Sequence, residues 1–309
     1  MKAIRLHARG GPGQVVYEEA PQPHLGEGDA LVRVLACSIT RGELGWDPTY
    51  IDEKGNSRTP TIPGHEVCGI VEAVGHGVQS VVKGDTVYGL TSFFRNGAAA
   101  EYVAVAAADL APKPKTLDPV NAASVPLSAL TAWQALFDHA GLQPGQKVLI
   151  HGAAGGVGIF AIQFAHWRGA RVIATASADN VEMLKKFGAE KVIDYKTQAF
   201  EKEVSDVDVV LDAIGGDTQQ RSWQVLKKGG VLVSIAGESI EQPSPDLGLK
   251  GIFFIVRPNR QQLIDIGQLI DGGLVRTIIA GVFPLAEAGR AFEMLSEPGK
   301  AGKIVLRVG

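Results

Sequence analysis

The sequence predicts an α/β protein with two domains, one β-barrel-like and the other built on a doubly wound parallel sheet. Short apolar runs separated by glycines and prolines fill residues 1 to about 115, a pattern typical of a β-rich domain. From about residue 118 onward, strand patterns alternate with helical ones, which indicates a parallel sheet. The chain has 309 residues, which is enough for two separate cores.

Four short strands are predicted in the first domain, at residues 30–36, 70–74, 86–90 and 101–105. Arg33 lies among apolar residues on the first of them, so we expect that strand to be at an edge or half-buried. Residues 47–63 are polar and contain bounding prolines, and we expect them to form a long loop over a cleft. The last apolar run, 303–308, is predicted as a strand that returns to this domain.

The second domain begins with a predicted helix at 119–137, for which Asp118 is the expected N-cap. Strands are predicted at residues 148–150, 171–176, 191–194, 208–214 and 231–236. Helices are expected between them, at residues 157–169, 180–187 and 218–227. Gly229-Gly230 is expected to end the last of these helices. Residues 251–256 are predicted as a strand buried on both faces, and 260–271 as a helix.

Composition and charge exclude several classes of protein. The net charge of −3 and the pI of about 6.2 give no reason to expect nucleic acid or an anionic membrane as a partner. Two cysteines, Cys37 and Cys68, exclude a disulfide framework and a four-cysteine zinc site. We find no apolar run of the ~20 residues that a membrane helix needs and no signal peptide. These observations favour a cytoplasmic protein with no membrane partner.

A glycine-rich turn is the strongest motif, because it follows a strand and opens a helix. It contains Gly152, Ala153, Ala154, Gly155, Gly156, Val157 and Gly158. In the dinucleotide fingerprint G-x-G-x-x-G, the first glycine is replaced by Ala153, and Gly155 and Gly158 fill the other two positions. Such a turn presents backbone N–H groups and a positive helix end to a pyrophosphate. A glycine-rich connection without a cofactor is the alternative interpretation.

Several further motifs occur in a recognisable order along the chain. They are Gly64-His65-Glu66-Val-Cys-Gly69, the run Gly-Asp-Thr-Val-Tyr-Gly at 84–89, residues 126–133, 152–158 and 192–195, and Gly302-Lys303-Ile-Val-Leu. With these motifs the chain resembles the medium-chain dehydrogenase/reductase superfamily, and within it the zinc-independent quinone oxidoreductase branch. The resemblance implies a GroES-like β-barrel catalytic domain (1–117 and 258–309), a Rossmann domain (118–257), and an NAD(P)H-dependent reductase with its active site between them.

The resemblance also places the ligands of a catalytic zinc. The histidine position is kept as His65, beside Glu66, while the two cysteine positions fall on Thr40 and near Leu127. Neither Thr nor Leu is a zinc ligand, and a catalytic zinc needs three protein ligands. We therefore expect no metal and interpret His65-Glu66 as a structural, hydrogen-bonded pair. An irregular zinc site that recruits Cys37, in an alcohol dehydrogenase, is an alternative.

The end of the second strand of the parallel sheet indicates which nicotinamide cofactor is bound. Ser177 stands where an NAD site carries an acidic residue on the ribose 2′-OH. A hydroxyl can donate to the 2′-phosphate of NADP, so we expect NADPH, although Ser177 can also be an ordinary helix cap. Asp179 lies two positions later, where it can cap the next helix. By resemblance, Asn180 and Tyr195 are further candidates for the 2′-phosphate.

The remaining site residues follow from the resemblance and from the edge of the sheet. Thr131 would meet the nicotinamide amide, and Ala236-Gly237 lie at the carboxyl edge where backbone can hold the ring. Thr40, Trp46 and Tyr50 would form the substrate wall. We expect direct hydride transfer from NADPH C4 to a flat electrophile, with orientation as the main catalytic contribution and Tyr50 as the candidate proton donor.

These expectations leave several functions open. The favoured one is reduction of quinones, and the nearest alternative is reduction of the double bond in α,β-unsaturated aldehydes and ketones. A non-enzymatic NADPH-binding protein is the alternative from another class. We also expect a homodimer, because the superfamily often pairs the strand corresponding to 251–256 across a two-fold axis and an apolar edge strand needs covering.

Overall fold

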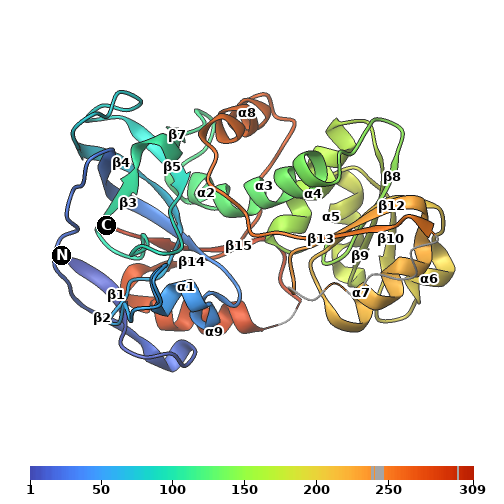
Figure 1. Cartoon of the computed structure of the whole chain (residues 1–309), viewed down its shortest axis with the longest axis horizontal. Coiled ribbons are helices and arrows are strands. Elements are labelled where there is room, and N and C mark those ends of the chain that lie inside the picture. Colours follow the sequence, from blue (N-terminus) through green and yellow to red (C-terminus); the bar gives the residue numbers. More distant parts are fainter. Residues whose placement is uncertain (238–239, 241–246, 298) are drawn as a thin grey trace. The chain divides into compact units, whose positions relative to one another are not determined.

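The computed structural model describes residues 1–237, 240, 247–297 and 299–309, and the remaining residues are drawn as a thin grey trace (Figure 1). The chain divides into two compact units. Unit 1 contains residues 1–127, 257–273 and 277–309, and unit 2 contains 128–256 and 274–276. The expected boundary near residue 118 thus lies ten residues before the one observed. The difference is helix α2 (Pro119–Ala123), which packs on strands of unit 1 through buried Ala122 and Ala123.

Unit 1 is built on a seven-stranded sheet in which strands distant in sequence are neighbours. The order is β14-β15-β3-β4-β5-β7, and β6 pairs with β3. The strand bounds are β3 Asp29–Ile39, β4 Glu66–Val74, β5 Thr86–Leu90, β6 Tyr102–Ala106, β7 Leu110–Pro112, β14 Ile279–Pro284 and β15 Lys303–Arg307. Strand β15 is antiparallel to β3, so the predicted return of the C-terminal strand to the first domain is confirmed.

Strand β3 lies inside this sheet rather than at its edge. It pairs with β4, β6 and β15, so of the two expected positions the edge is wrong. The half-buried alternative is confirmed, because Arg33 is half-buried within the sheet. The segment 47–63 begins with a short helix, α1 (Asp47–Tyr50), and continues without a further helix or strand. A loop is therefore correct for most of its length.

Unit 1 also contains two strands and a helix that the sequence patterns did not predict. Strands β1 (Lys2–Leu6) and β2 (Val15–Glu19) form an antiparallel pair. Helix α9 (Ala288–Ser296) buries Ala288, Ala291 and Phe292, which follow the spacing of one helical face. Helix α8 (Arg260–Asp271) has the predicted bounds, and its cap Asn259 accepts a hydrogen bond from the N–H of Gln262 at 3.0 Å.

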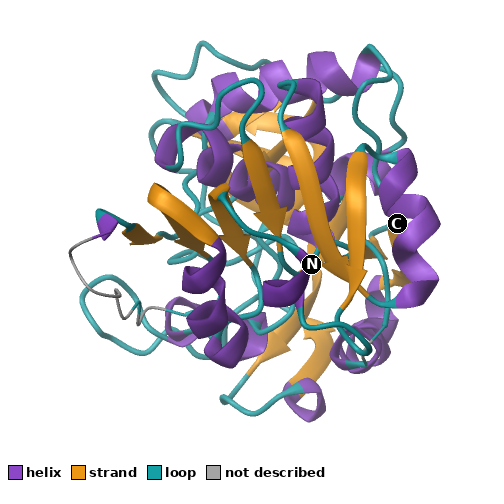
Figure 2. Cartoon of the chain, turned by 90° about the vertical axis from the view of Figure 1, so that its right-hand side faces the viewer, coloured by secondary structure: helices purple, strands orange, loops and turns teal. Residues whose placement is uncertain are grey.

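Unit 2 contains a six-stranded sheet with every neighbouring pair parallel, and the connecting helices flank it (Figure 2). The order is β10-β9-β8-β11-β12-β13, so the predicted doubly wound sheet is confirmed. The strands are β8 Lys147–Ile150, β9 Arg171–Ala176, β10 Ala189–Asp194, β11 Val207–Asp212, β12 Leu226–Ser234 and β13 Lys250–Phe253. The helices are α3 Pro126–Trp133, α4 Gly156–Trp167, α5 Val181–Lys186, α6 Phe200–Glu203 and α7 Gly216–Ser222.

Two predicted helices are wrong in part. The helix expected at 119–137 is interrupted after α2, because Pro126 has no N–H to continue the ladder and instead begins α3. The predicted cap is confirmed, since the Asp118 carboxylate accepts from the N–H of Asn121 at 2.8 Å. The helix expected at 218–227 stops at Val225, because Leu226 pairs with β11 and starts a strand. Gly229-Gly230 lies in that strand, where its register shifts.

Within the part of the chain that the structure describes, strand β13 is the edge strand of the parallel sheet and pairs with β12 alone. Its residues Gly251, Ile252 and Phe253 are half-buried, and Ile255 just beyond it is 60% exposed. The expectation of burial on both faces is therefore wrong for residues 251–255, whereas Val256 is buried. Among the described residues no further strand continues the sheet beyond β13, so its side chains stay partly open to solvent.

Among the residues that the structure describes, no helix is long and apolar enough to cross a membrane. Cys37 and Cys68 are both buried and unpaired.

Candidate active site

The glycine turn leaves strand β8 and enters helix α4 with little room for side chains. Gly152 has a φ of +67°, a conformation that favours glycine. A Cβ on Gly158 would lie 2.5 Å from both the Ala153 Cα and the Gly152 carbonyl oxygen. Ala153 is buried, has no positive φ, and donates its N–H to the Thr175 carbonyl at 3.2 Å. The backbone conformation at the first fingerprint position therefore accepts an alanine.

Helix α4 presents N–H groups at this turn that have no partner within the helix. Its N-cap is Gly155, and the N–H of Ile159 makes the first intrahelical bond, to the Gly155 carbonyl at 3.1 Å. The preceding N–H groups, of Gly156, Val157 and Gly158, have no partner within the helix. Gly155 is exposed, and Ala154 is half-buried. At this turn a ligand can approach the positive helix end closely without meeting side chains, which fits the pyrophosphate of a dinucleotide.

His151, to which the sequence analysis assigned no role, fixes the start of this turn. Its Nδ1 lies 3.0 Å from Thr175 Oγ1, and its Nε2 lies 3.0 Å from Ser222 Oγ. Burial lowers the pKa of His151 to about 4, so the ring is neutral at physiological pH. One neutral imidazole thus ties the end of β8 to β9 and α7, which holds the strand that leads into the glycine turn.

The end of β9 carries the residues that the sequence predicts for cofactor choice. Ser177 and Asn180 are buried, and the Asn180 amide donates to Ser177 Oγ at 3.0 Å. Because Ser177 accepts this bond, its own proton is available to another acceptor. Tyr195 follows the neighbouring strand β10, is 58% exposed, and donates its N–H to the Ala176 carbonyl. Lys196 is exposed beside it in sequence, a cation that the sequence analysis missed.

The carboxyl ends of β11 and β12 are joined by a buried carboxylate. Asp212 accepts hydrogen bonds from the Ile214 and Gly215 N–H groups at 2.9 Å each. It also accepts from Gln219 Nε2 at 3.1 Å and from Ser234 Oγ at 2.9 Å. The Ser234 hydroxyl in turn accepts from the Ala236 N–H at 3.3 Å. These bonds fix the segment that leads into Ala236-Gly237, for which the sequence predicts a position beside the nicotinamide.

Thr131 is buried on α3, in the same unit as the glycine turn. Thr40, Trp46 and Tyr50 belong to unit 1. The structure thus distributes the predicted residues over both units, with every predicted cofactor residue in unit 2.

In unit 1, Thr40 belongs to a buried charged cluster. Lys303, only 6% exposed, places its Nζ 2.5 Å from Glu66 Oε2 and 3.0 Å from Thr40 Oγ1. The other Glu66 oxygen accepts from the Leu127 N–H at 3.0 Å. In the sequence, Lys303 stands out only as part of the motif at 302–306. A charged residue at the start of an apolar strand was the available signal, because a lysine is rarely buried without a partner.

A second buried carboxylate, Glu43, lies beside this cluster. Its two oxygens accept from the N–H groups of Gly64 and Thr40. Burial raises the pKa of Glu43 to about 7. His65 lies 4.0 Å from Glu43 through Nε2, and its Nδ1 lies 3.0 Å from Thr91 Oγ1. Burial lowers the pKa of His65 to about 3, so this histidine is neutral.

This donor set does not fit a catalytic zinc. Thr40 is engaged by an ammonium group, and Leu127 offers no side-chain ligand. Cys37 is buried, and burial raises the pKa of its thiol further from the thiolate that zinc binds. Within the described part of the chain, no three His, Cys, Asp or Glu side chains converge on a metal position. The expectation that His65 and Glu66 form a hydrogen-bonded pair is wrong, because His65 bonds to Thr91 and Glu66 bonds to Leu127 and Lys303.

The aromatic residues predicted for the substrate wall have different surroundings. Trp46 is half-buried and meets the Phe93 ring edge-on at a centroid distance of 5.5 Å, and Phe93 meets His65 in the same way at 5.1 Å. Tyr50 is buried, and its hydroxyl donates to the Leu44 carbonyl at 2.6 Å. Burial raises the pKa of Tyr50. A proton-donating role for Tyr50 therefore requires this bond to break first.

Comparison with known proteins adds family matches to this geometry. Residues 26–115 match the alcohol dehydrogenase GroES-like domain, and residues 187–306 match the zinc-binding dehydrogenase family. A probable zinc-binding oxidoreductase, mitochondrial, of Arthroderma benhamiae is 35% identical over 93% of this chain and 91% of its own. The rat quinone oxidoreductase is 32% identical over 99% and 97% of the two chains.

Two further proteins extend the comparison. An NADPH-dependent alkenal/one oxidoreductase, chloroplastic, of Arabidopsis thaliana is 33% identical over 92% of this chain and 73% of its own. The solved quinone oxidoreductase of Coxiella burnetii superposes with a TM-score of 0.90 at 31% identity, over 100% of this chain and 99% of the other. With a GroES-like domain, a parallel-sheet Rossmann domain and relatives that match along nearly its whole length, the chain belongs to the medium-chain dehydrogenase/reductase superfamily of oxidoreductases.

Proposed function

We propose that this protein is an NADPH-dependent oxidoreductase that transfers hydride to quinones or related electrophilic acceptors without zinc. The observation that carries the proposal is the strand–glycine turn–helix of unit 2 together with the Ser177–Asn180 pair at the end of β9. The turn accepts a dinucleotide pyrophosphate, and the pair offers neutral hydrogen-bonding groups where an NAD site carries an acid.

The surroundings of Ser177 support NADP over NAD. The Ser177 hydroxyl accepts a hydrogen bond from Asn180, so its own proton can be donated to a phosphate oxygen. Tyr195 and Lys196 are exposed at the end of the adjacent strand β10 and add a hydroxyl and a cation for the same dianion. Asp179 is exposed one residue before Asn180, and its carboxylate is the feature of this region that would favour NAD instead.

The bound nicotinamide would supply the hydride, and the protein would supply orientation and polarisation. Thr40 is the residue that we propose for the acceptor oxygen. Its hydroxyl accepts a hydrogen bond from Lys303 and so keeps its own proton for donation to that oxygen. The buried ammonium polarises the hydroxyl, which strengthens it as a donor to a developing negative charge. We retain Thr131 for the nicotinamide amide and Trp46 and Tyr50 for the substrate wall.

Reduction of α,β-unsaturated aldehydes and ketones is the second candidate. The Arabidopsis relative is named an alkenal/one oxidoreductase, and another relative, from Solanum lycopersicum, is named 2-methylene-furan-3-one reductase. The same chemistry applies to both classes, because hydride to the β-carbon of an enone also leaves negative charge on an oxygen that Thr40 can stabilise.

The test is oxidation of NADPH, followed at 340 nm, against a benzoquinone, a naphthoquinone, an enal, an enone and a simple aldehyde. Parallel reactions contain NADH or EDTA. We expect turnover of quinones or enones with NADPH and no effect of EDTA, and the better acceptor class identifies the substrate. Aldehyde reduction abolished by EDTA would refute the zinc-free mechanism. Tight NADPH binding without turnover of any acceptor would instead favour a non-enzymatic NADPH-binding protein.

We also propose a homodimer formed through the edge strand β13. Its outer edge lacks a pairing strand among the described residues, and Ile255 beside it is 60% exposed. An uncovered apolar edge readily pairs with a second copy. Light scattering coupled to gel filtration should give twice the chain mass for the wild type and the single mass for Ile255→Lys.

For location we propose the cytoplasm. The support is that both cysteines are unpaired and buried, which suits a reducing compartment. Some relatives are named as mitochondrial, so cell fractionation with a mitochondrial marker is the deciding measurement.

A further inference from the structure

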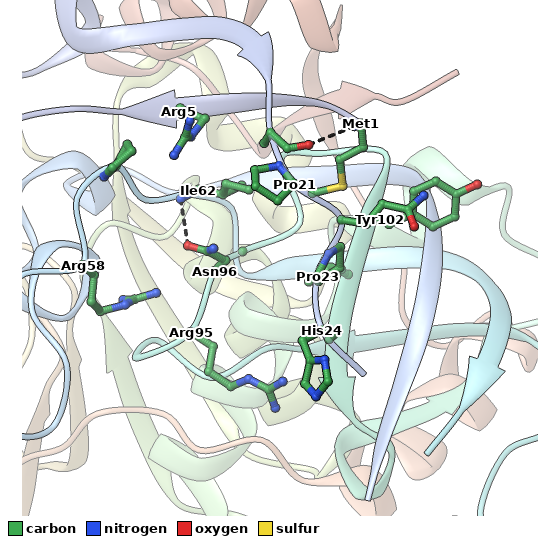
Figure 3. Close-up of a pocket in the computed structure, with 16 residues that line it drawn as sticks. Met1, Arg5, Pro21, Pro23, His24, Arg58, Ile62, Arg95, Asn96 and Tyr102 are labelled. Atoms are coloured by element: carbon green, nitrogen blue, oxygen red, sulfur yellow. Dashed lines mark hydrogen bonds between the residues drawn. The ribbon is translucent and has the colours of Figure 1, made fainter. Parts of the chain in front are cut away.

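Unit 1 contains a cavity of about 530 Å³ that the proposed reaction does not use (Figure 3). Strand β1, the segment 20–24, the segments 58–62 and 95–97, and strand β6 supply its walls. Its volume lies in the range of small-molecule sites, about 300–1,000 Å³. Every lining residue belongs to unit 1, so the cavity is a property of this unit alone.

The lining of the cavity is basic. Arg5, Arg58, Arg95 and His24 contribute to it, whereas none of its lining residues is an aspartate or glutamate. In Figure 3, Arg58 lies at one side, Arg95 and His24 lie at the bottom, and Asn96 lies between these groups and Arg5. The whole chain carries a net charge of −3. This concentration of cations is therefore local and does not follow from the overall composition.

Two of these arginines form ion pairs with carboxylates that are not among the lining residues. Arg95 forms a two-pronged bond to the Asp29 carboxylate at 2.8 and 2.7 Å. Arg5 reaches Glu18 at 3.3 Å. Their charges are balanced, so they line the cavity without requiring a ligand.

Arg58 differs, because no carboxylate of the described residues lies within ion-pair distance of it, and Asp52 acts on it only from further away. Its Nη1 donates to the carbonyl oxygens of Pro48 and Phe93, and it forms no ion pair with any described residue. The side chain is half-buried, and burial lowers its pKa. A half-buried guanidinium that bonds only to neutral carbonyls through one nitrogen keeps its remaining N–H donors for an anion.

Asn96 adds a neutral donor to the same space. Its Oδ1 accepts from Thr61 Oγ1 at 3.2 Å and from the Ile62 N–H at 3.1 Å. Those two bonds fix the amide plane and leave the NH₂ group as a donor. Pro21, Pro60 and Ile62 provide apolar wall near these polar groups.

We propose that this cavity binds a small organic carboxylate, with the carboxylate on Arg58 and Asn96 and the apolar body against the proline-lined wall. The guanidinium fork matches the two oxygens of a carboxylate. The proposal goes beyond the reaction above, because it assigns a second ligand to a site that contains none of the residues proposed for hydride transfer.

The test uses the full chain saturated with NADP⁺, so that dinucleotide sites are filled, and titrates benzoate against its neutral analogue benzamide by calorimetry. We expect saturable binding of benzoate at least about tenfold tighter than that of benzamide. Equal affinity for the two, or no saturable binding of benzoate, would overturn the proposal. The titration does not depend on turnover, so its outcome is separate from that of the activity assay.

Variants locate the binding. Asn96→Asp keeps the acceptor for Thr61 and Ile62 but brings a negative charge into the cavity, so benzoate affinity should fall at least about tenfold. Arg58→Gln should cause a loss of similar size. Lys83→Gln removes an exposed cation elsewhere in unit 1 and should leave the affinity unchanged. Wild-type benzoate affinity in a folded Asn96→Asp protein would refute the assignment, even if Arg58→Gln failed to fold.

Discussion

The ion pair between Lys303 and Glu66 gives a quantitative test of how unit 1 is held together. Glu66 is fully buried and Lys303 is 6% exposed, and their charged atoms lie 2.5 Å apart. Replacing Lys303 by Met leaves a buried carboxylate whose remaining hydrogen-bond donor, among the described residues, is the Leu127 N–H. Removing one member of a buried pair costs about 3–5 kcal/mol.

That free-energy cost corresponds to a decrease in the melting temperature of unit 1. For a unit of this size, 1 kcal/mol corresponds to about 2–4 °C, so Lys303→Met should lower the transition of unit 1 by about 6–20 °C. Differential scanning calorimetry is the assay, because the transitions of two units can be separated. The exposed pair of Lys83 and Glu72, 3.0 Å apart, is the matched control, since a surface pair contributes about 0–1 kcal/mol.

A double-mutant cycle distinguishes the ion pair from simple loss of packing. Glu66→Gln should also destabilise, because it leaves the Lys303 ammonium buried without a carboxylate. The double variant removes both charges, so its loss should be smaller than the sum of the single losses, with a coupling of about 1–3 kcal/mol. Strictly additive losses, or a Lys303→Met protein that melts within 2 °C of the wild type by the conversion above, would refute the reasoning.

Four further outcomes are expected. Thr40→Val should lower kcat about 10²–10³-fold with NADPH affinity unchanged, and equal kcat would remove Thr40 from the mechanism. Gly158→Ala should weaken NADPH binding at least about tenfold, because the new Cβ would lie 2.5 Å from backbone atoms. The control Gly289→Ala, whose Cβ would have open space, should leave NADPH binding unchanged. Calorimetry measures NADPH binding by both variants. Ser177→Asp should shift the NADPH to NADH ratio of kcat/KM at least about tenfold towards NADH, and an unchanged ratio would contradict the assigned 2′-phosphate site. Glu43 has a pKa of about 7 in the folded protein against an ordinary value of 4.5. Its contribution to the free energy of unfolding is therefore full below about pH 4.5 and is lost as pH rises through 7. The loss amounts to about 3 kcal/mol, and Glu43→Gln should flatten that part of the stability–pH profile measured by urea unfolding.

The sequence predicts those parts of the fold whose signals are local. Strand β9 and helix α8 have their predicted bounds, because a β-branched run and a capped amphipathic pattern each end at clear punctuation. The strand at Leu226 could not be predicted in this way. Residues 218–227 suit a helix locally, and only the pairing of Leu226 with Val207 makes the end of that segment a strand.

The residues of the candidate site also fall into those with a local sequence signal and those without one. The glycine turn and Ser177 are found from sequence because the backbone motif and the residue that reads the ribose are contiguous with strands. The partners of Lys303 and Asp212 are found only from the structure, since the sheets bring them together from distant parts of the chain. A sequence pattern carries no information about which distant carboxylate will neutralise a buried lysine.

The return of β15 to unit 1 also has a consequence for biosynthesis. Strand β15 lies between β14 and β3 in the sheet, yet its residues are made after the whole contiguous segment 128–256 of unit 2. During synthesis, β3 therefore lacks its neighbour β15 at a time when all strands of unit 2 have already been made. Because domains generally fold as units during translation, we expect the parallel-sheet unit to mature on the ribosome first, although it begins later in the chain. Pulse proteolysis of stalled nascent chains ending before residue 279 should recover a protected unit 2 and a cleavable N-terminal region.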